Sequence, residues 1–180
     1  MPLLRIACLS ALSVFIGVEP ILAATPGNKP VLTTSERVAI VNVVRHVIAA
    51  IREGNAQELL GYISTTQGLE CTDTAYSYAQ VKKALMNPGS YLHQSLFDTV
   101  AFAHSCGSEY PREYPAISDK QFLETSNDEI GVKLFSSNWA EVTIQSPVAG
   151  HYKRIWSLYK DAGHWKLAGA GFIIGNCTCG

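Results

Sequence analysis

The side chains with the most obvious chemistry in this chain are its cysteines. There are five; Cys8 lies near the N-terminus, and the others are Cys71, Cys106, Cys177 and Cys179. Four cysteines in an exported chain predict two disulfide bonds, in one of several pairings. We favour one bond between the two central cysteines and one within the C-terminal pair. The alternative joins the C-terminal tail to the central cysteines.

Export is expected from the N-terminal sequence. Arg5 precedes an apolar run from Ile6 to Val18, and small residues follow up to Ala24. This pattern is typical of a secretory signal peptide, and the apolar run is too short to span a bilayer. The expected parts are a signal peptide at 1–24, a flexible lead-in at 25–32 and a single domain at 33–180. The mature protein would lack Cys8 and any membrane span, and it would be periplasmic or secreted.

Other catalytic and metal-binding patterns have little support. His104, His151 and His164 could be combined with the Cys-Thr-Cys tail, but zinc sites usually use Cys-x-x-Cys spacing, and an oxidising compartment favours disulfides. The sequence contains neither the G-x-S-x-G motif of serine hydrolases nor a phosphate-binding loop. We therefore expect no metal and no cofactor.

Composition narrows the classes of partner. The formal net charge is −1 and 47% of the residues are hydrophobic, which is typical of a globular protein rather than a disordered one. Lysine and arginine are scattered along the chain. The protein therefore has no electrostatic basis for binding nucleic acid or an anionic membrane.

The first half of the chain has the spacing and the capping residues of helices. Aliphatic residues from Ile40 to Ile51 recur on one side of a helix that Thr33 and Glu36 would cap. Further helices are expected from Asn55 to Ile63, from about Tyr76 to Met86, from Ser90 to Phe97 and from Ser118 onward. The segment 64–74 is expected to be a polar loop.

The second half has the alternation of strands. Ala140, Val142 and Ile144 alternate with polar residues, which predicts a half-buried strand. Further strands are expected at Val132–Phe135, Tyr152–Lys160 and Trp165–Ile174. Helices followed by such a meander predict an α+β fold, with N-terminal amphipathic helices on a curved antiparallel sheet stapled by disulfides.

Two stretches resemble the NTF2-like superfamily, whose cone-shaped α+β fold includes ketosteroid isomerase. The stretch from Ala49 to Leu60 is similar to the junction between the family's first two helices. The stretch from Ile155 to Leu167, with its Asp-Ala-Gly-His turn, resembles the family's last hairpin. Members of this fold include isomerases, dehydratases, immunity proteins and binding modules, so the resemblance implies a fold rather than an activity.

The resemblance also suggests where proton-transfer chemistry could occur. Enzymes of this fold place an Asp, His or Tyr inside the cone, where burial tunes its pKa. The candidates in this chain are Asp73, Tyr76, Tyr78 and His93, with Asp98 as a further possibility. The alternative is that these residues serve as caps, turns and surface.

Aromatic residues suggest binding instead. Tyr110 and Tyr114 lie in a proline-rich segment that could present their rings to a protein partner. The candidates for lining an apolar pocket between sheet and helices are Tyr152, Trp156, Leu158 and Trp165. The alternatives are that the loop tyrosines fold back on the body and that the strand residues fill an ordinary core.

These observations favour a non-catalytic module that binds a small apolar ligand or a protein partner. One alternative is a cofactor-free lyase or isomerase of the NTF2-like type. Another is a structural or inhibitory partner protein that uses the segment with Tyr110 and Tyr114. Similarity to the family also suggests a possible homodimer through the open face of the sheet.

Overall fold

The computed structural model describes residues 30–71, 74–106, 118–126, 129–145 and 153–171. Its elements are α1 (Thr34–Arg52), α2 (Ala56–Tyr62), β1 (Leu69–Cys71), β2 (Thr74–Tyr76), α3 (Tyr78–Leu85), α4 (Tyr91–Phe97), α5 (Thr99–Cys106), α6 (Asp119–Thr125), β3 (Ile130–Ser136), β4 (Trp139–Gln145), β5 (Lys153–Asp161) and β6 (His164–Gly169). The predicted α+β class is confirmed. Within the described ranges no helix is both long enough and apolar enough to cross a bilayer.

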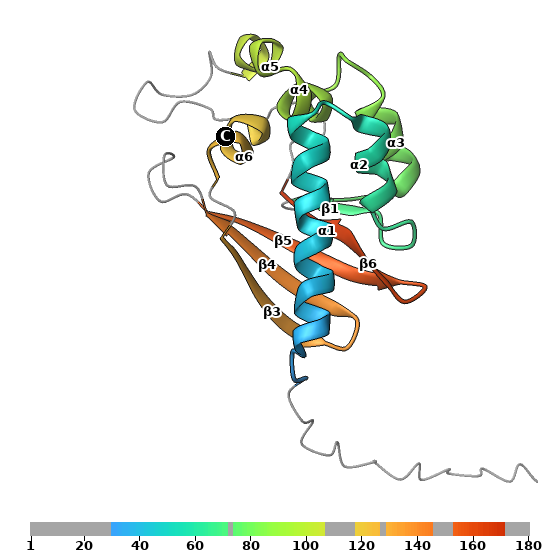
Figure 1. The fold of residues 1–180 in the computed structure, drawn as a ribbon. Helices are drawn as coiled ribbons and strands as arrows, with labels where there is room; N and C mark the ends of the chain where they lie inside the picture. The colour runs from blue at the N-terminus through green and yellow to red at the C-terminus, as the bar shows by residue number, and fades with distance from the viewer. Residues whose placement is uncertain (1–29, 72–73, 107–117, 127–128, 146–152, 172–180) are drawn as a thin grey trace, which may run out of the picture.

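The strands form one sheet in the order β2-β1-β6-β5-β4-β3. Strands β3 to β6 are the antiparallel meander that the alternating pattern predicts. The β1–β2 hairpin extends the sheet through a parallel contact between β1 and β6. Figure 1 shows the strands fanning out below the cluster of shorter helices.

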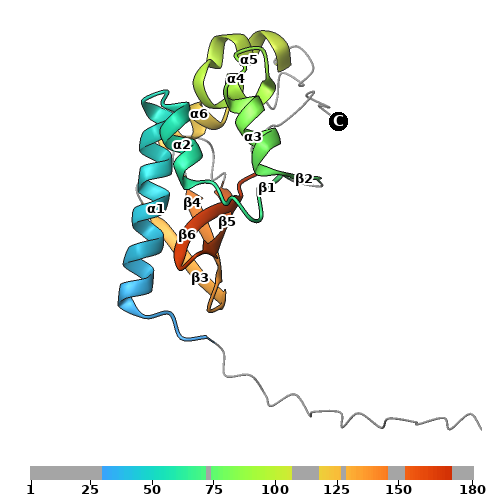
Figure 2. The same cartoon turned by 90° about the vertical axis from the view of Figure 1, so that its right-hand side faces the viewer.

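Helix α1 lies along one face of this sheet, which we call the inner face (Figures 1 and 2). The helix begins after Thr33, whose Oγ1 accepts a hydrogen bond from the backbone N–H of Glu36 at 3.1 Å. Its aliphatic stripe is fully buried; the stripe consists of Ile40, Val44, Val47, Ile48 and Ile51. Because many of these residues are β-branched and poor helix formers, their burial stabilises the helix more than propensity does.

The two faces of the sheet differ sharply in exposure. Along β5, Trp156 and Leu158 are completely buried against the core, whereas Ile155, the residue before Trp156, is 47% exposed. Successive side chains of a strand point to opposite faces. The face opposite α1, which we call the outer face, therefore carries Ile155 and the residues that alternate with the core.

Three predictions of secondary structure are wrong. The strand expected at Trp165–Ile174 ends at Gly169. The expected polar loop at 64–74 contains β1 and part of β2, and Gly68 makes this hairpin possible: its φ is +70°, and any β-carbon there would collide with the carbonyl oxygen of Tyr76. The third helix begins at Tyr78, because Ser77 forms a capping box with Gln80 and leaves Tyr76 in β2.

Helix α5 was not predicted. A backbone N–H of its first turn, that of Ala101, donates to the Asp98 carboxylate at 2.9 Å. Asp98 thereby caps this helix.

The predicted disulfides involve atoms outside the described part of the chain. Cys71 ends β1 and Cys106 ends α5, but the description does not extend to their side chains, and Cys177 and Cys179 lie beyond it altogether. The pairing remains a prediction. The signal peptide and the lead-in up to residue 29 also lie outside the described residues.

A buried carboxylate, Asp161, fixes the turn between β5 and β6. It is 9% exposed and accepts hydrogen bonds from the Ser64 hydroxyl at 2.9 Å and the Thr65 backbone N–H at 2.8 Å. Burial opposes its ionisation, but hydrogen bonds from the side chains of Thr66 and Ser64, and from the backbone N–H groups of Thr66 and Thr65, outweigh that effect and lower the pKa of Asp161. The Asp161 carboxylate thus joins the segment that follows α2 to the turn between β5 and β6.

The assignment of the two faces can be tested on β5. Leu158→Ala should lower the free energy of unfolding by about 2–5 kcal/mol, because it leaves a cavity in the core. Ile155→Ala, directly before the fully buried Trp156 but on the opposite face of the strand, should cost less than about 1 kcal/mol. Urea unfolding of both variants measures this difference. Equal losses would contradict the assignment.

The Asp161 network predicts a pH dependence. Asp161→Asn should lower the free energy of unfolding at neutral pH by about 1–3 kcal/mol, because a neutral amide replaces a charged acceptor. Since the pKa of Asp161 is lower in the folded protein, its contribution is complete above the unfolded value of about 4 and is lost as the pH falls through the folded value. The difference between wild type and variant should therefore shrink as the pH is lowered from about 5 to about 2.

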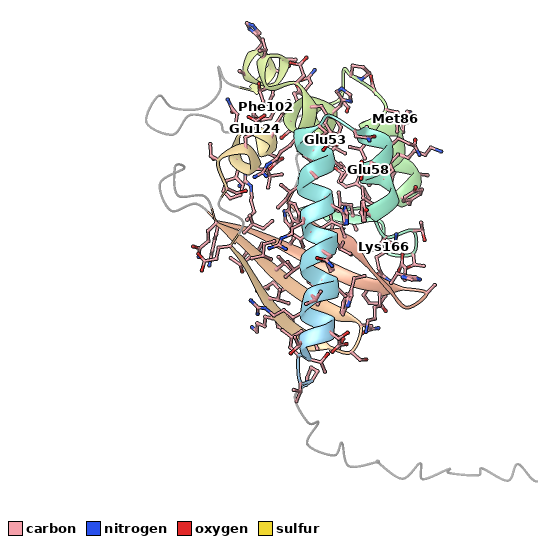
Figure 3. All side chains as sticks on the ribbon, in the orientation of Figure 1. Glu53, Glu58, Met86, Phe102, Glu124 and Lys166 are labelled. Atoms are coloured by element: carbon pink, nitrogen blue, oxygen red, sulfur yellow. The ribbon has the colours of Figure 1, made fainter. Side chains whose placement is uncertain are left out.

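Urea unfolding across this pH range is the measurement, and Glu124→Gln is the control. Glu124 lies on the surface of α6 (Figure 3), and its side chain is 48% exposed beside Lys120. The control should follow the wild type closely. A difference for Asp161→Asn that is constant with pH would contradict the role of the charge.

Candidate functional site

Three large apolar side chains meet solvent on the outer face of the sheet. The exposed fractions are 38% for Phe135, 45% for Trp139 and 47% for Ile155. These residues belong to β3, β4 and β5, and in Figure 2 none of the helices that the structure describes covers this side of the strands. Phe135 stacks on Trp139, whereas Ile155 pairs with Thr143, four residues along β4 from Trp139. Exposed apolar side chains on one sheet face are typical of a binding surface.

The strand register places one row of residues across this face. Lys133 of β3 pairs with Glu141 of β4, and Glu141 pairs with Ser157 of β5. Ser157 in turn pairs with Gly169 of β6, and Gly169 pairs with Glu70 of β1. The row therefore joins residues that are far apart in the sequence.

A hollow of about 390 Å³ lies on this side of the sheet. It is lined by Gln67, Glu70, Ala75, Ser136, Asn138, Trp139, Ser157, Tyr159 and Ala168. The lining combines two aromatic rings with two amides, two serines and one carboxylate. Small-ligand sites commonly have about this volume and this mixture of apolar and polar groups.

The depth of the hollow comes from small residues at an irregular point of the sheet. The pairing between β5 and β6 shifts after Ser157, so that Ala168 has no paired residue in β5. A β-carbon added to the neighbouring Gly169 would lie 3.2 Å from the β-carbon of Ser157. Large side chains are therefore missing from the middle of the row, and the space above it is open.

Hydrogen bonds and stacking hold the aromatic wall of the hollow in place. The side-chain amide of Asn138 donates to the Tyr159 hydroxyl at 2.9 Å, and the Ser136 hydroxyl donates to Oδ1 of the same Asn138 side chain at 2.6 Å. Phe135 stacks on Trp139 with ring centroids 4.8 Å apart. The wall is therefore held by contacts within the protein itself.

The three predicted ligand-binding residues that the structure describes lie on the other face of the sheet. Trp156 and Leu158 are completely buried and Trp165 is 5% exposed, all within the hydrophobic core. Their packing matches the alternative of an ordinary core that the sequence left open. Tyr152 lies outside the described residues. A ligand contact by any of the four remains a prediction.

The candidates for proton transfer that the structure describes do not line the hollow. Tyr76 ends β2 and Tyr78 begins α3, both half-buried. Nδ1 of His93, on α4, lies 2.7 Å from the carbonyl oxygen of Leu85, and its ring meets Phe97 edge-on. Asp73 lies outside the described part. Catalysis by these residues also remains a prediction.

Tyr110 and Tyr114 likewise lie outside the described ranges, so their partner-binding role remains a prediction. Among the residues that are described, no group of three or more His, Cys, Asp or Glu side chains is placed to hold a metal ion.

A polar cluster around Asp119 is buried between the helices and the sheet, and the sequence does not predict it. Asp119 of α6 is 2% exposed; its carboxylate accepts a hydrogen bond from the Ser95 hydroxyl at 2.7 Å and pairs with the Arg154 guanidinium at 3.3 Å. The guanidinium also lies over the Phe122 ring. The cluster fastens α4 and α6 to β5, so it has a structural explanation.

Sequence reasoning missed the residues of the hollow, although one signal for them was present. The alternation that sets Trp156 and Leu158 on one side of β5 also sets Ser157 and Tyr159 on the other. Nothing in the sequence places Glu70 beside them, because that contact depends on the parallel pairing of β1 with β6.

Comparisons with known proteins add little to this geometry. No protein-family model matches the chain, and no curated protein matches it. Among solved structures, a protein of unknown function from Mycobacterium tuberculosis is similar at 10% identity and a TM-score of 0.39, over 80% of this chain and 74% of the other.

Two further solved structures are similar. An NTF-2 like protein of unknown function from Shewanella oneidensis MR-1 is 12% identical, with a TM-score of 0.41, over 74% of this chain and 95% of the other. A protein assigned as a calcium/calmodulin dependent protein kinase II association domain from Xanthomonas campestris is 13% identical, with a TM-score of 0.36, over 80% and 91%. At these scores the likenesses carry no argument about function, and the resemblance to the NTF2-like fold is weak.

Proposed function

We propose that this protein is a non-catalytic module that binds a small, partly apolar ligand in the hollow on the outer face of its sheet. The observation that carries the proposal is the exposure of Trp139 above a depression floored by Ser157 and Ala168. An indole ring that is 45% exposed beside a ready-made hollow can bury further apolar surface when a ligand binds.

The packing of the inner face supports this choice of site. A cone-shaped fold could hold a ligand between its helices and its sheet. In this protein that space is filled by Trp156, Leu158 and Leu167, whose side chains are at most 1% exposed. A ligand there would have to displace core residues, at a cost of several kcal/mol. The outer hollow needs no such rearrangement.

A protein partner is the second candidate, and Ile155 and Phe135 favour it. Both are exposed apolar side chains on the outer face, and neither lines the hollow. A second copy of the chain could cover them, which would make the module a homodimer. Sedimentation equilibrium of the wild type and of Ile155→Glu distinguishes the two candidates: a dimer that the substitution dissociates would favour the partner.

We further propose that the module works outside the cytoplasm, in the periplasm or as a secreted protein. The proposal rests on the signal-peptide pattern of the first 24 residues. Detection of the mature chain, beginning near Thr25, in an exported fraction would support it. A full-length chain confined to the cytoplasm would contradict it.

The ligand site is tested by screening a library of small fragments against ¹⁵N-labelled protein by NMR. Trp139→Phe assigns the indole signal of Trp139 among those of the three tryptophans. We expect hits to shift this signal together with the backbone signals of Ser157 and Ala168. In Trp139→Ala, affinity for these hits should fall about five-fold or more, because the ring that they contact is gone.

The matched control is Val100→Ala, which removes an exposed apolar side chain on α5. It should leave the affinity for the hits unchanged. A screen in which no fragment shifts the Trp139 signal would overturn the proposal, as would hits that bind Trp139→Ala as well as they bind wild type.

A further inference from the structure

We infer that the hollow binds an organic amine, with the apolar body of the ligand on Trp139 and Tyr159 and its protonated amino group at Glu70. The inference rests on the proposed function, because it names the chemical class of that ligand. Its basis is the separation of apolar and charged groups in the lining: the two aromatic rings lie on β4 and β5, and the carboxylate lies on β1.

The register sets the distance that the ligand must span. Glu70 pairs with Gly169, and Gly169 pairs with Ser157, so the Cα atom of Glu70 lies about 10 Å from that of Ser157 at the usual strand spacing. Trp139 lies one strand further along, on β4. If the side chains of Glu70 and Trp139 both extend over the outer face, the space between the carboxylate and the indole ring fits a ligand with one ring and a short chain that ends in an amino group.

The charged groups near the hollow favour a cation. Glu70 is the only charged residue lining it, within the part of the chain that is described. Glu141 lies in the same row across the sheet, and no ion pair joins it to any described residue. A cation would meet a carboxylate, whereas an anion would meet repulsion.

The ammonium groups of the two nearby lysines contact groups other than Glu70. Lys133 lies over the Phe135 ring, with its Nζ 4.3 Å from the centroid. Lys166 pairs with Tyr159 in the sheet, but its ammonium group reaches past the edge to the carbonyl oxygen of Gly61 (Figure 3). Neither ammonium group therefore neutralises Glu70.

The neutral polar groups of the lining also suit an ammonium group. An ammonium group donates three hydrogen bonds and accepts none. Besides Glu70, the hollow offers the side-chain carbonyl oxygen of Gln67 and the hydroxyl of Ser157. The aromatic wall adds the faces of two rings, which attract cations and stack on apolar groups.

The test compares 2-phenylethylamine with 2-phenylethanol, which has the same ring and chain but no charge at neutral pH. Each is titrated into wild-type protein at low salt, and the shift of the Trp139 indole signal is followed by NMR. We expect the amine to bind about five-fold more tightly than the alcohol. Raising the ionic strength should weaken the amine alone.

Glu70→Gln should abolish the preference for the amine and leave the affinity for the alcohol unchanged. The matched control is Glu53→Gln, which removes an exposed carboxylate at the end of α1, outside the hollow's lining (Figure 3). It should retain the full preference. Both variants should unfold at wild-type urea concentrations, because each replaces an exposed group.

The outcomes separate the inference from the proposed function. If amine and alcohol bind equally at Trp139, or if Glu70→Gln keeps the preference, the amine assignment is overturned and the hollow remains a ligand site. Tighter binding of phenylacetate than of the amine would also overturn the assignment. If none of these compounds moves the Trp139 signal and the fragment screen finds no hit there, both ideas fail.

Discussion

The burial of Trp156 and Leu158 beneath α1 is the constraint on which the rest of the structure depends. These side chains of β5 are fully enclosed by the core, together with the aliphatic stripe of the helix. Because a strand sends alternate residues to opposite faces, this packing decides every other orientation in the meander. A shift of one residue would bring Ser157 and Tyr159 into the core and expose Trp156.

Because the inner face is buried in the core, the outer face is the side of the sheet on which a ligand can bind without disturbing that core. Its hollow depends on side chains that are small, at Ala168 and Gly169, as much as on the rings that surround it. The polar groups at its rim come from the end of β3 and the β3–β4 turn, from β1 and from the turn that precedes β1. Binding would therefore draw on the parts of the sheet that do least for the core.

The sequence indicates the helices well because their signals are local. Thr33, Asn55 and Ser90 each cap the helix that their neighbours predict. The alternation in β5 shows that the strand has two different faces, but not which face the helices cover. The large ring of Trp156 predicts a ligand site on its face of the strand, and this face is the buried one. The hollow could not be predicted, because Glu70 meets Ser157 only through strand pairings between distant segments.

The Asp161 network has a consequence for the hollow as well as for stability. The Ser64 hydroxyl that donates to Asp161 also accepts a hydrogen bond from the backbone N–H of Gln67, at 2.9 Å. Gln67 is part of the hollow's rim. The position of Gln67 at the rim and the conformation of the β5–β6 turn therefore both depend on the Asp161 carboxylate. Through thermodynamic linkage, a ligand that needs Gln67 in place would compete with a proton that it never touches.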